Sequence, residues 1–151
     1  MKIKSTVAAL SAAVAVAGTL ALVSTSAQAA DCKHKVGSIL SLTGSYGAYG
    51  VPISKAAQMG VEQVNAARAA VGVGCDLTYD VRDSQTQASV AIDAATKMID
   101  IEGVTALVGP ISSGITAPLL SSVTVEKGVV LIATASTSPT FTKMGREGKT
   151  K

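Results

Sequence analysis

The chain has 151 residues, of which 48% are hydrophobic and 15% are charged, and its formal net charge is +3. This composition fits a globular domain rich in Ala and Val. Two of the positive charges, on Lys2 and Lys4, lie at the extreme N-terminus. The remainder is close to neutral, which argues against nucleic acid or an anionic membrane as a partner.

Residues 1–29 are predicted to be a cleavable export signal. The positive segment "MKIK" precedes the apolar run "TVAALSAAVAVAGTLALV", and small residues at Ala27 and Ala29 mark a cleavage site after Ala29. A retained membrane anchor is the alternative, but an Ala-rich run of about 18 residues barely spans a bilayer. We therefore expect a mature chain, residues 30–151, in the periplasm.

Export places both cysteines, Cys32 and Cys75, in an oxidising compartment. Each precedes a strand-like stretch, so parallel neighbouring strands would bring them to one edge of the sheet, and we expect a disulfide between them. Lipidation of Cys32 is disfavoured because Asp31 stands where a lipobox has a small residue. Cys32 and His34 supply only two ligands, which do not close a zinc site. No metal and no cofactor are therefore expected.

The first part of the mature chain reads as a strand over residues 35–42, a Gly-rich loop "TGSYGAYG", and an amphipathic helix ending near Gly72. The expected apolar face of that helix consists of Ile53, Ala56, Ala57, Gly60, Val61 and Val64.

The segment "DLTYDVRD" alternates apolar and polar residues, which predicts a strand near the edge of a sheet. Asp83 or Ser84 is a candidate cap for the following helix. The apolar stripe of that helix consists of Ala88, Ala91, Ile92, Ala95, Met98 and Ile99, and Gly103 terminates it.

The stretches "VTALVG" and "VVLIATA" are nearly continuous apolar runs, which favours central parallel strands covered on both faces. Between them a third helix is predicted from about Ser113 to Lys127, with Gly128 beyond its end. Strict alternation of strands and helices predicts an α/β fold with an open parallel sheet and helices on both faces.

Ligands of such sheets bind beyond the carboxyl ends of the strands. The three loops expected there, "TGSYGAYG", "GPISSG" and "TASTSP", contain no nucleophile–base pair, no metal cluster and no phosphate-binding lysine. They offer hydroxyls and backbone N–H groups, which suit a small bound anion. Simple capping of a helix by Ser112 and Ser113 is the alternative for one loop. We expect a binding protein and not an enzyme, although a small α/β hydrolase or nucleotide-dependent enzyme is the rival on this fold.

Five segments together resemble the periplasmic branched-chain amino acid (leucine/isoleucine/valine) binding proteins of ABC importers. They are "LSLTGSYGAYGVP", "AAQMGVEQVNAA", "YDVRDSQTQASVAIDAATKMI", "ALVGPISSGITAPLLSSV" and "VLIATASTSPTFT". The resemblance implies a type I periplasmic binding protein fold whose first lobe is represented incompletely by residues 30–151, because family members are more than twice as long and have two lobes. It implies an amino acid as ligand and, for a full-length protein, an inner-membrane ABC permease as partner.

The resemblance also implies roles for individual residues. Ser113 would bind the ligand carboxylate, while Ala135, Ser136 and Thr137 would bind the carboxylate and ammonium through backbone and hydroxyl groups. Tyr49 would border the ligand side chain. Ser136 departs from the alanine often found at its position. The family also takes amides, urea and aromatic acids, so these remain alternatives to a branched-chain amino acid. The sensor domain of a receptor with the same fold is a further alternative.

Overall fold

The computed structural model describes residues 34–74 and 76–150. The expected export signal and both cysteines of the expected disulfide, Cys32 and Cys75, lie outside the described residues. Within the described part, none of the helices is both long and apolar enough to cross a membrane.

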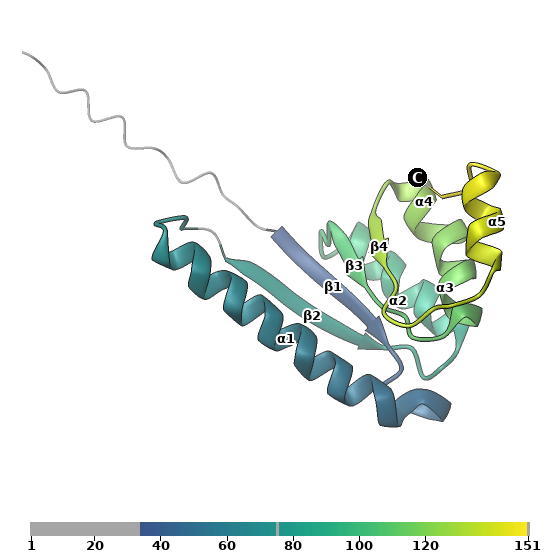
Figure 1. Cartoon of the computed structure of the whole chain (residues 1–151), viewed down its shortest axis with the longest axis horizontal. Helices are drawn as coiled ribbons and strands as arrows, with labels where there is room; N and C mark the ends of the chain where they lie inside the picture. The colour runs from purple at the N-terminus through teal and green to yellow at the C-terminus, as the bar shows by residue number, and fades with distance from the viewer. Residues whose placement is uncertain (1–33, 75, 151) are drawn as a thin grey trace, which may run out of the picture.

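Four parallel strands form one sheet in the order β2-β1-β3-β4 (Figure 1). The strands are β1 (His34–Leu40), β2 (Leu77–Asp83), β3 (Ala106–Val108) and β4 (Val130–Ile132). Val36 of β1 pairs with Tyr79 on one side and with Ala106 on the other, so β1 and β3 are the interior strands. The expected open parallel α/β sheet is confirmed, and β2 lies at an edge as its alternating pattern predicts.

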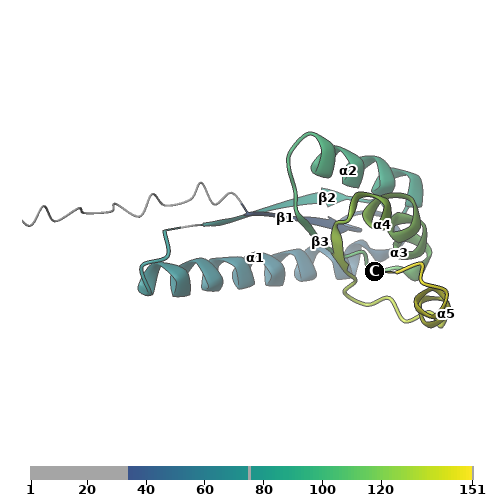
Figure 2. The ribbon, with the colours of Figure 1, turned by 90° about the horizontal axis from the view of Figure 1, so that it is seen from above.

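Helices cover both faces of the sheet (Figure 2). Helix α1 (Gly47–Ala70) follows a short 3₁₀ turn, η1 (Gly44–Tyr46), and lies on one face against β1 and β2. Helix α2 (Ala88–Asp100) lies on the other face. The expected third helix is one continuous run packed on α2, consisting of α3 (Ser113–Leu119), the π-helical η2 (Leu120–Thr124) and α4 (Val125–Lys127). Gly128 ends this run with a left-handed φ of 66°, as predicted.

The main core lies between the sheet and the α2 face. Its buried residues come from both interior strands, from the segment before β3, from α2 and from the third helical run: Ile39, Ala91, Ala95, Met98, Val104, Leu107, Ile115, Leu119 and Val123. The predicted stripe of α2 is therefore confirmed in its central members. Fully burying the larger of these side chains contributes about 1.5–3 kcal/mol each, so this face carries most of the apolar stabilisation.

Helix α1 buries much less. Only Gly50 is fully buried, while Ile53, Ala57 and Val61 are half-buried toward the sheet. The other expected members of its apolar face, Ala56, Gly60 and Val64, are exposed. The predicted apolar face included too many residues. Because α1 lies over only β1 and β2, the residues on the outer side of that face have no strand to contact.

The position of β4 contradicts the sequence-based expectation. Its apolar run predicts a central strand, but β4 forms the second edge of the sheet, and Val130 and Ile132 are 61% and 60% exposed. Only Leu131 of this strand packs against the core. An apolar run shows that a strand is able to be buried, but not that a neighbour covers it. Within the described residues no fifth strand lies beside β4.

Two local features also differ from expectation. The N-cap of α2 is Gln87, not Asp83 or Ser84, and it makes no side-chain capping hydrogen bond. A fifth helix, α5 (Thr140–Arg146), follows the loop after β4 and was not predicted. Its short amphipathic pattern is too weak to identify a helix from sequence alone.

Candidate functional site

The carboxyl ends of β1, β3 and β4 lie at the same edge of the sheet, because all the strands are parallel (Figure 1). Three loops leave this edge. The first leads into η1 and α1, the second runs from Gly109 into α3, and the third joins β4 to α5. All five predicted ligand-binding residues lie on these loops or in the first turn of the helix that follows.

Ser113 is the first residue of α3, and its hydroxyl connects two of the three loops. Its Oγ accepts the backbone N–H of Thr137 at 3.1 Å and of Ser138 at 3.2 Å. A serine hydroxyl accepts through its lone pairs and donates its own proton separately. Ser113 therefore fixes the loop after β4 and still has one O–H to donate. The structure brings Ser113 and Thr137 together, as the sequence led us to expect.

The start of α3 leaves backbone donors free. The N-cap residue Ser112 is extended, and its carbonyl accepts the N–H groups of Ile115 and Thr116 at 3.1 and 2.9 Å. Its side chain makes no capping hydrogen bond. In the described part of the chain, the N–H groups of Ser113 and Gly114 have no hydrogen-bond partner. Donors of this kind at a helix start favour a negatively charged group.

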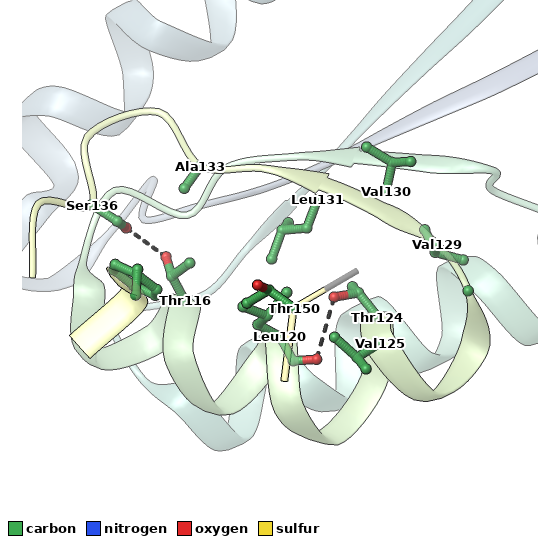
Figure 3. Close-up of a pocket in the computed structure, with 12 residues that line it drawn as sticks. Thr116, Leu120, Thr124, Val125, Val129, Val130, Leu131, Ala133, Ser136 and Thr150 are labelled. Carbon is green, nitrogen blue, oxygen red and sulfur yellow. Dashed lines mark hydrogen bonds between the residues drawn. The ribbon is translucent and has the colours of Figure 1, made fainter. Parts of the chain in front are cut away.

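The hydroxyl of Ser136 is turned toward α3. It lies 2.6 Å from the hydroxyl of Thr116 (Figure 3) and 3.5 Å from the carbonyl of Ile111. Ala135 and Thr137, on either side, are exposed. Ser136 therefore anchors the loop by its side chain, while its neighbours are accessible. Sequence reasoning grouped all three residues as binding groups and did not foresee this division.

Tyr49 lies in the first turn of α1 and is 62% exposed. Its ring is 6.4 Å from that of Tyr46, centroid to centroid, at an interplanar angle of 49°. This tilted geometry is favourable for aromatic pairs. No hydrogen bond between described residues joins Tyr49 to the Ser113–Thr137 pair. Tyr46 and Tyr49, which we call the aromatic wall, are therefore a separate feature at the same edge of the sheet.

The main cavity of the described residues is not this site. It has a volume of about 570 Å³ and lies beside β4, between the third helical run and α5 (Figure 3). Its lining is largely apolar and includes Leu120, Val125, Leu131 and Phe141. Of the predicted binding residues only Ser136 borders it. The chemistry suited to a zwitterion lies on the loops outside the cavity, so we assign the candidate site to the loops.

Charged groups are not part of this arrangement. Among the described residues, no group of three or more His, Cys, Asp or Glu side chains is placed to hold a metal ion. The hydrogen-bonding groups around Ser113 and Thr137 are uncharged hydroxyls and backbone amides. Such groups are able to replace water around a small anion or zwitterion.

The family model described as "Periplasmic binding protein" matches residues 33–145 of the chain. The chain belongs to this family. A Leu/Ile/Val-binding protein, BraC3 of Rhizobium johnstonii, is 31% identical over 110 residues, which cover 73% of this chain and 29% of that protein. The Leu/Ile/Val-binding protein homolog 2 of Brucella abortus is 33% identical over 102 residues, which cover 68% and 26% of the two chains.

Solved structures of periplasmic binding proteins share the fold. The branched-chain amino acid transporter substrate-binding protein LivJ of Streptococcus pneumoniae, crystallised with isoleucine, superposes with a TM-score of 0.66 at 31% identity. The match covers 74% of this chain and 31% of LivJ. The leucine-binding protein LivK of Thermotoga maritima gives a TM-score of 0.63 at 25% identity, covering 73% and 30%. This chain thus spans only 26–31% of the length of these relatives.

Proposed function

We propose that the chain forms part of the substrate-binding component of an ABC importer and that its ligand is an α-amino acid, most favourably a branched-chain one. The observation that carries the proposal is the coupling of Ser113 and Thr137 at the carboxyl edge of the sheet. The relatives bear the names of Leu/Ile/Val-binding proteins and of a transporter's substrate-binding protein, and not of enzymes. We therefore assign a binding role without catalysis.

The free O–H of Ser113 and the unpaired N–H groups at the start of α3 would bind the ligand carboxylate. The exposed loop beyond β4 would accept from the ammonium group through the Ala135 carbonyl and the Thr137 hydroxyl. Tyr49 would contact the apolar side chain. Neutral donors and acceptors of this kind hold a zwitterion reversibly, which a transport protein requires. In a full-length protein the partner would be an inner-membrane permease.

An NMR titration of the folded chain with leucine, isoleucine, valine, acetamide and urea tests this proposal. We expect saturable shifts at Ser113, Gly114 and Thr137 for the amino acids. Ser113→Ala should weaken binding at least about 10-fold, because a hydrogen bond to a charged group is lost. Ser112→Ala, which removes a hydroxyl without a capping hydrogen bond, is the matched control and should bind normally. Saturation by urea or acetamide alone would replace the amino acid with an amide as ligand.

We further propose that the chain is exported, cleaved after Ala29 and bridged between Cys32 and Cys75, and that it works in the periplasm. The support is the sequence pattern of residues 1–29 together with the family to which the chain belongs. Intact-mass spectrometry of periplasmic protein should give residues 30–151 less two hydrogen atoms. Retention of Met1, or alkylation of both thiols without prior reduction, would contradict this proposal.

A further inference from the structure

Asp83, the last residue of β2, binds the loop that follows β1. Its Oδ1 accepts the backbone N–H of Leu42 at 2.9 Å and of Thr43 at 3.2 Å, and its Oδ2 accepts the Thr43 hydroxyl at 2.6 Å. The N–H of Gln85 also donates to Oδ1, at 2.8 Å. One carboxylate thus satisfies three donors of the neighbouring loop and one of its own, and all four donors are uncharged.

The residues that follow Asp83 strengthen the connection. The Thr86 hydroxyl donates to the Thr43 carbonyl and accepts the Tyr46 N–H, each at 3.3 Å. A Cβ atom at Gly44 would lie 2.6 Å from the Gln85 carbonyl oxygen, so the two loops are in tight backbone contact. Gln85 and Thr86 adopt left-handed φ angles of 52° and 59°. Such a conformation is costly for a β-branched residue and persists only where surrounding contacts enforce it.

The loop that Asp83 binds leads directly into the aromatic wall. Tyr46 ends η1, and Tyr49 follows in the first turn of α1. In the described part of the chain, every hydrogen bond that leaves residues 42–46 for another segment ends on Asp83 or Thr86. The hydrogen bonds that hold the segment leading to the two tyrosines therefore come from Asp83 and from the loop that follows it.

We propose that Asp83 is a positioning residue for the candidate ligand site: its ionised carboxylate holds the loop that carries Tyr46 and Tyr49 without touching the ligand. The ligand part of this inference rests on the proposed function, whereas the positioning part does not. The residue lies at the edge strand of the sheet, apart from Ser113 and Thr137, and the proposal assigns it a role in side-chain specificity.

The ionisation of Asp83 agrees with this role. Burial by itself raises its pKa, but the hydrogen bonds from the Thr43 hydroxyl and from the N–H groups of Gln85, Thr43 and Leu42 outweigh it, so the pKa is lowered. No charged side chain among the described residues forms an ion pair with Asp83. Since the pKa is lowered, the loop should stay ordered at neutral pH and loosen only as the pH falls through that lowered value.

The first measurement needs no ligand. NMR spectra of the whole chain should show that Asp83→Ala moves the ring signals of Tyr46 and Tyr49 but not that of Tyr79, which lies on β2 away from the loop. The amides of Leu42 and Thr43 should exchange with water at least about 10-fold faster. Asp80→Asn is the matched control, because Asp80 lies on the same strand and pairs with Arg82 instead. It should leave both tyrosines unchanged.

Acid titration distinguishes positioning from mere packing. The Tyr46 and Tyr49 signals of the unmodified chain should shift together below the usual carboxyl range, and Asp83→Asn should abolish that step. Thr43→Val, which removes one donor and keeps the carboxylate, should give an intermediate effect and serves if Asp83→Ala does not fold. Unchanged tyrosine signals in any folded Asp83 variant, or an acid step that survives Asp83→Asn, would overturn the proposal.

The ligand measurement separates this inference from the proposed function. Asp83→Ala should weaken leucine binding at least about 10-fold, because Tyr46 and Tyr49 would no longer be held against the side chain of the ligand. Glycine lacks that side chain, so its affinity should change little. If the unmodified chain binds no amino acid but its tyrosines respond to Asp83, the proposed function fails and the positioning role holds. If Asp83→Ala binds leucine normally, the positioning role in ligand recognition fails.

Discussion

Hydroxyl groups make the decisive side-chain contacts at the carboxyl edge of the sheet. Ser113 receives two backbone amides, and Ser136 and Thr116 lie 2.6 Å apart. Ser41 and Ser84 form a buried pair at 2.9 Å where β1 and β2 end. Each group is small and uncharged, so it satisfies buried polar atoms without the large desolvation cost of an ion. The contacts around Ser113 and Ser136 therefore involve no charged group, which suits reversible binding of a zwitterion.

Gly50 is predicted to be essential for the packing of α1 against the end of β1. A Cβ atom there would overlap the Ser41 carbonyl oxygen, whose backbone cannot move without disturbing the end of β1. We expect Gly50→Ala to lower the free energy of unfolding by about 1–3 kcal/mol in urea denaturation. Gly60, on the same helix, has open space around its Cα. Gly60→Ala should therefore raise that free energy by about 0.5–1 kcal/mol, and equal effects of the two substitutions would contradict this account.

At this scale, sequence reasoning named hydroxyl groups that the structure does place at the carboxyl edge of the sheet, but it did not give all of their contacts. The carboxylate-binding role of Ser113 was expected from the resemblance to the family, since the residue pattern alone also allowed simple capping of the helix. Its second role, as acceptor for Thr137 and Ser138, depends on how the loop after β4 folds back. Asp83 was expected to cap the next helix, since capping is a local rule. Apart from the nearby Gln85 N–H, its partners Leu42 and Thr43 lie about 40 residues away, and no local pattern encodes them.

At the scale of elements, helix α2 and the third helical run bury most of the apolar core, whereas α1 buries little. The regular elements were predictable where the apolar periodicity is clear, as for Ala88–Asp100 with its buried stripe. They were not predictable where the position of an element depends on its neighbours in the fold. The exposure of β4 depends on what lies beside it, and a strand's own apolar residues cannot report that.

The exposed strand β4 leads to a prediction about association. Val130 and Ile132 face outward on an edge that has no charged residue or proline of its own, a feature that promotes edge-to-edge pairing. Replacing both with lysine should reduce self-association in sedimentation experiments. The free energy of unfolding should change by less than about 0.5 kcal/mol, because neither residue is buried.

Leu131→Lys provides the matched control on the same strand. Leu131 packs against the core, so a charge there should destabilise the fold by more than about 2 kcal/mol. If the Val130→Lys, Ile132→Lys double variant loses as much stability as Leu131→Lys, then β4 is not an exposed edge in solution.

At the scale of the whole molecule, the candidate site is one wall. Ala135, Thr137 and Tyr49 are exposed, and none of them lines the main cavity beside β4. The chain spans only about 29–31% of the length of BraC3 and LivJ. The resemblance to a two-lobed family was inferred from five sequence segments that occur in the same order as in the family.

The last prediction therefore concerns affinity. Water remains in contact with a ligand bound to an open wall, and it weakens each electrostatic contact. A two-walled site with a Kd of about 1 μM corresponds to about 8 kcal/mol of binding free energy. If one wall supplies half of it, about 4 kcal/mol remains, which is a Kd near 1 mM. NMR titration of the folded chain with leucine should give saturation in that range. The shifts should cluster at Ser113, Gly114 and Thr137 and not along the apolar cavity beside β4. Micromolar binding would show that this chain alone holds a complete site, and shifts confined to the cavity would place the ligand away from Ser113 and Thr137 and contradict the proposed function.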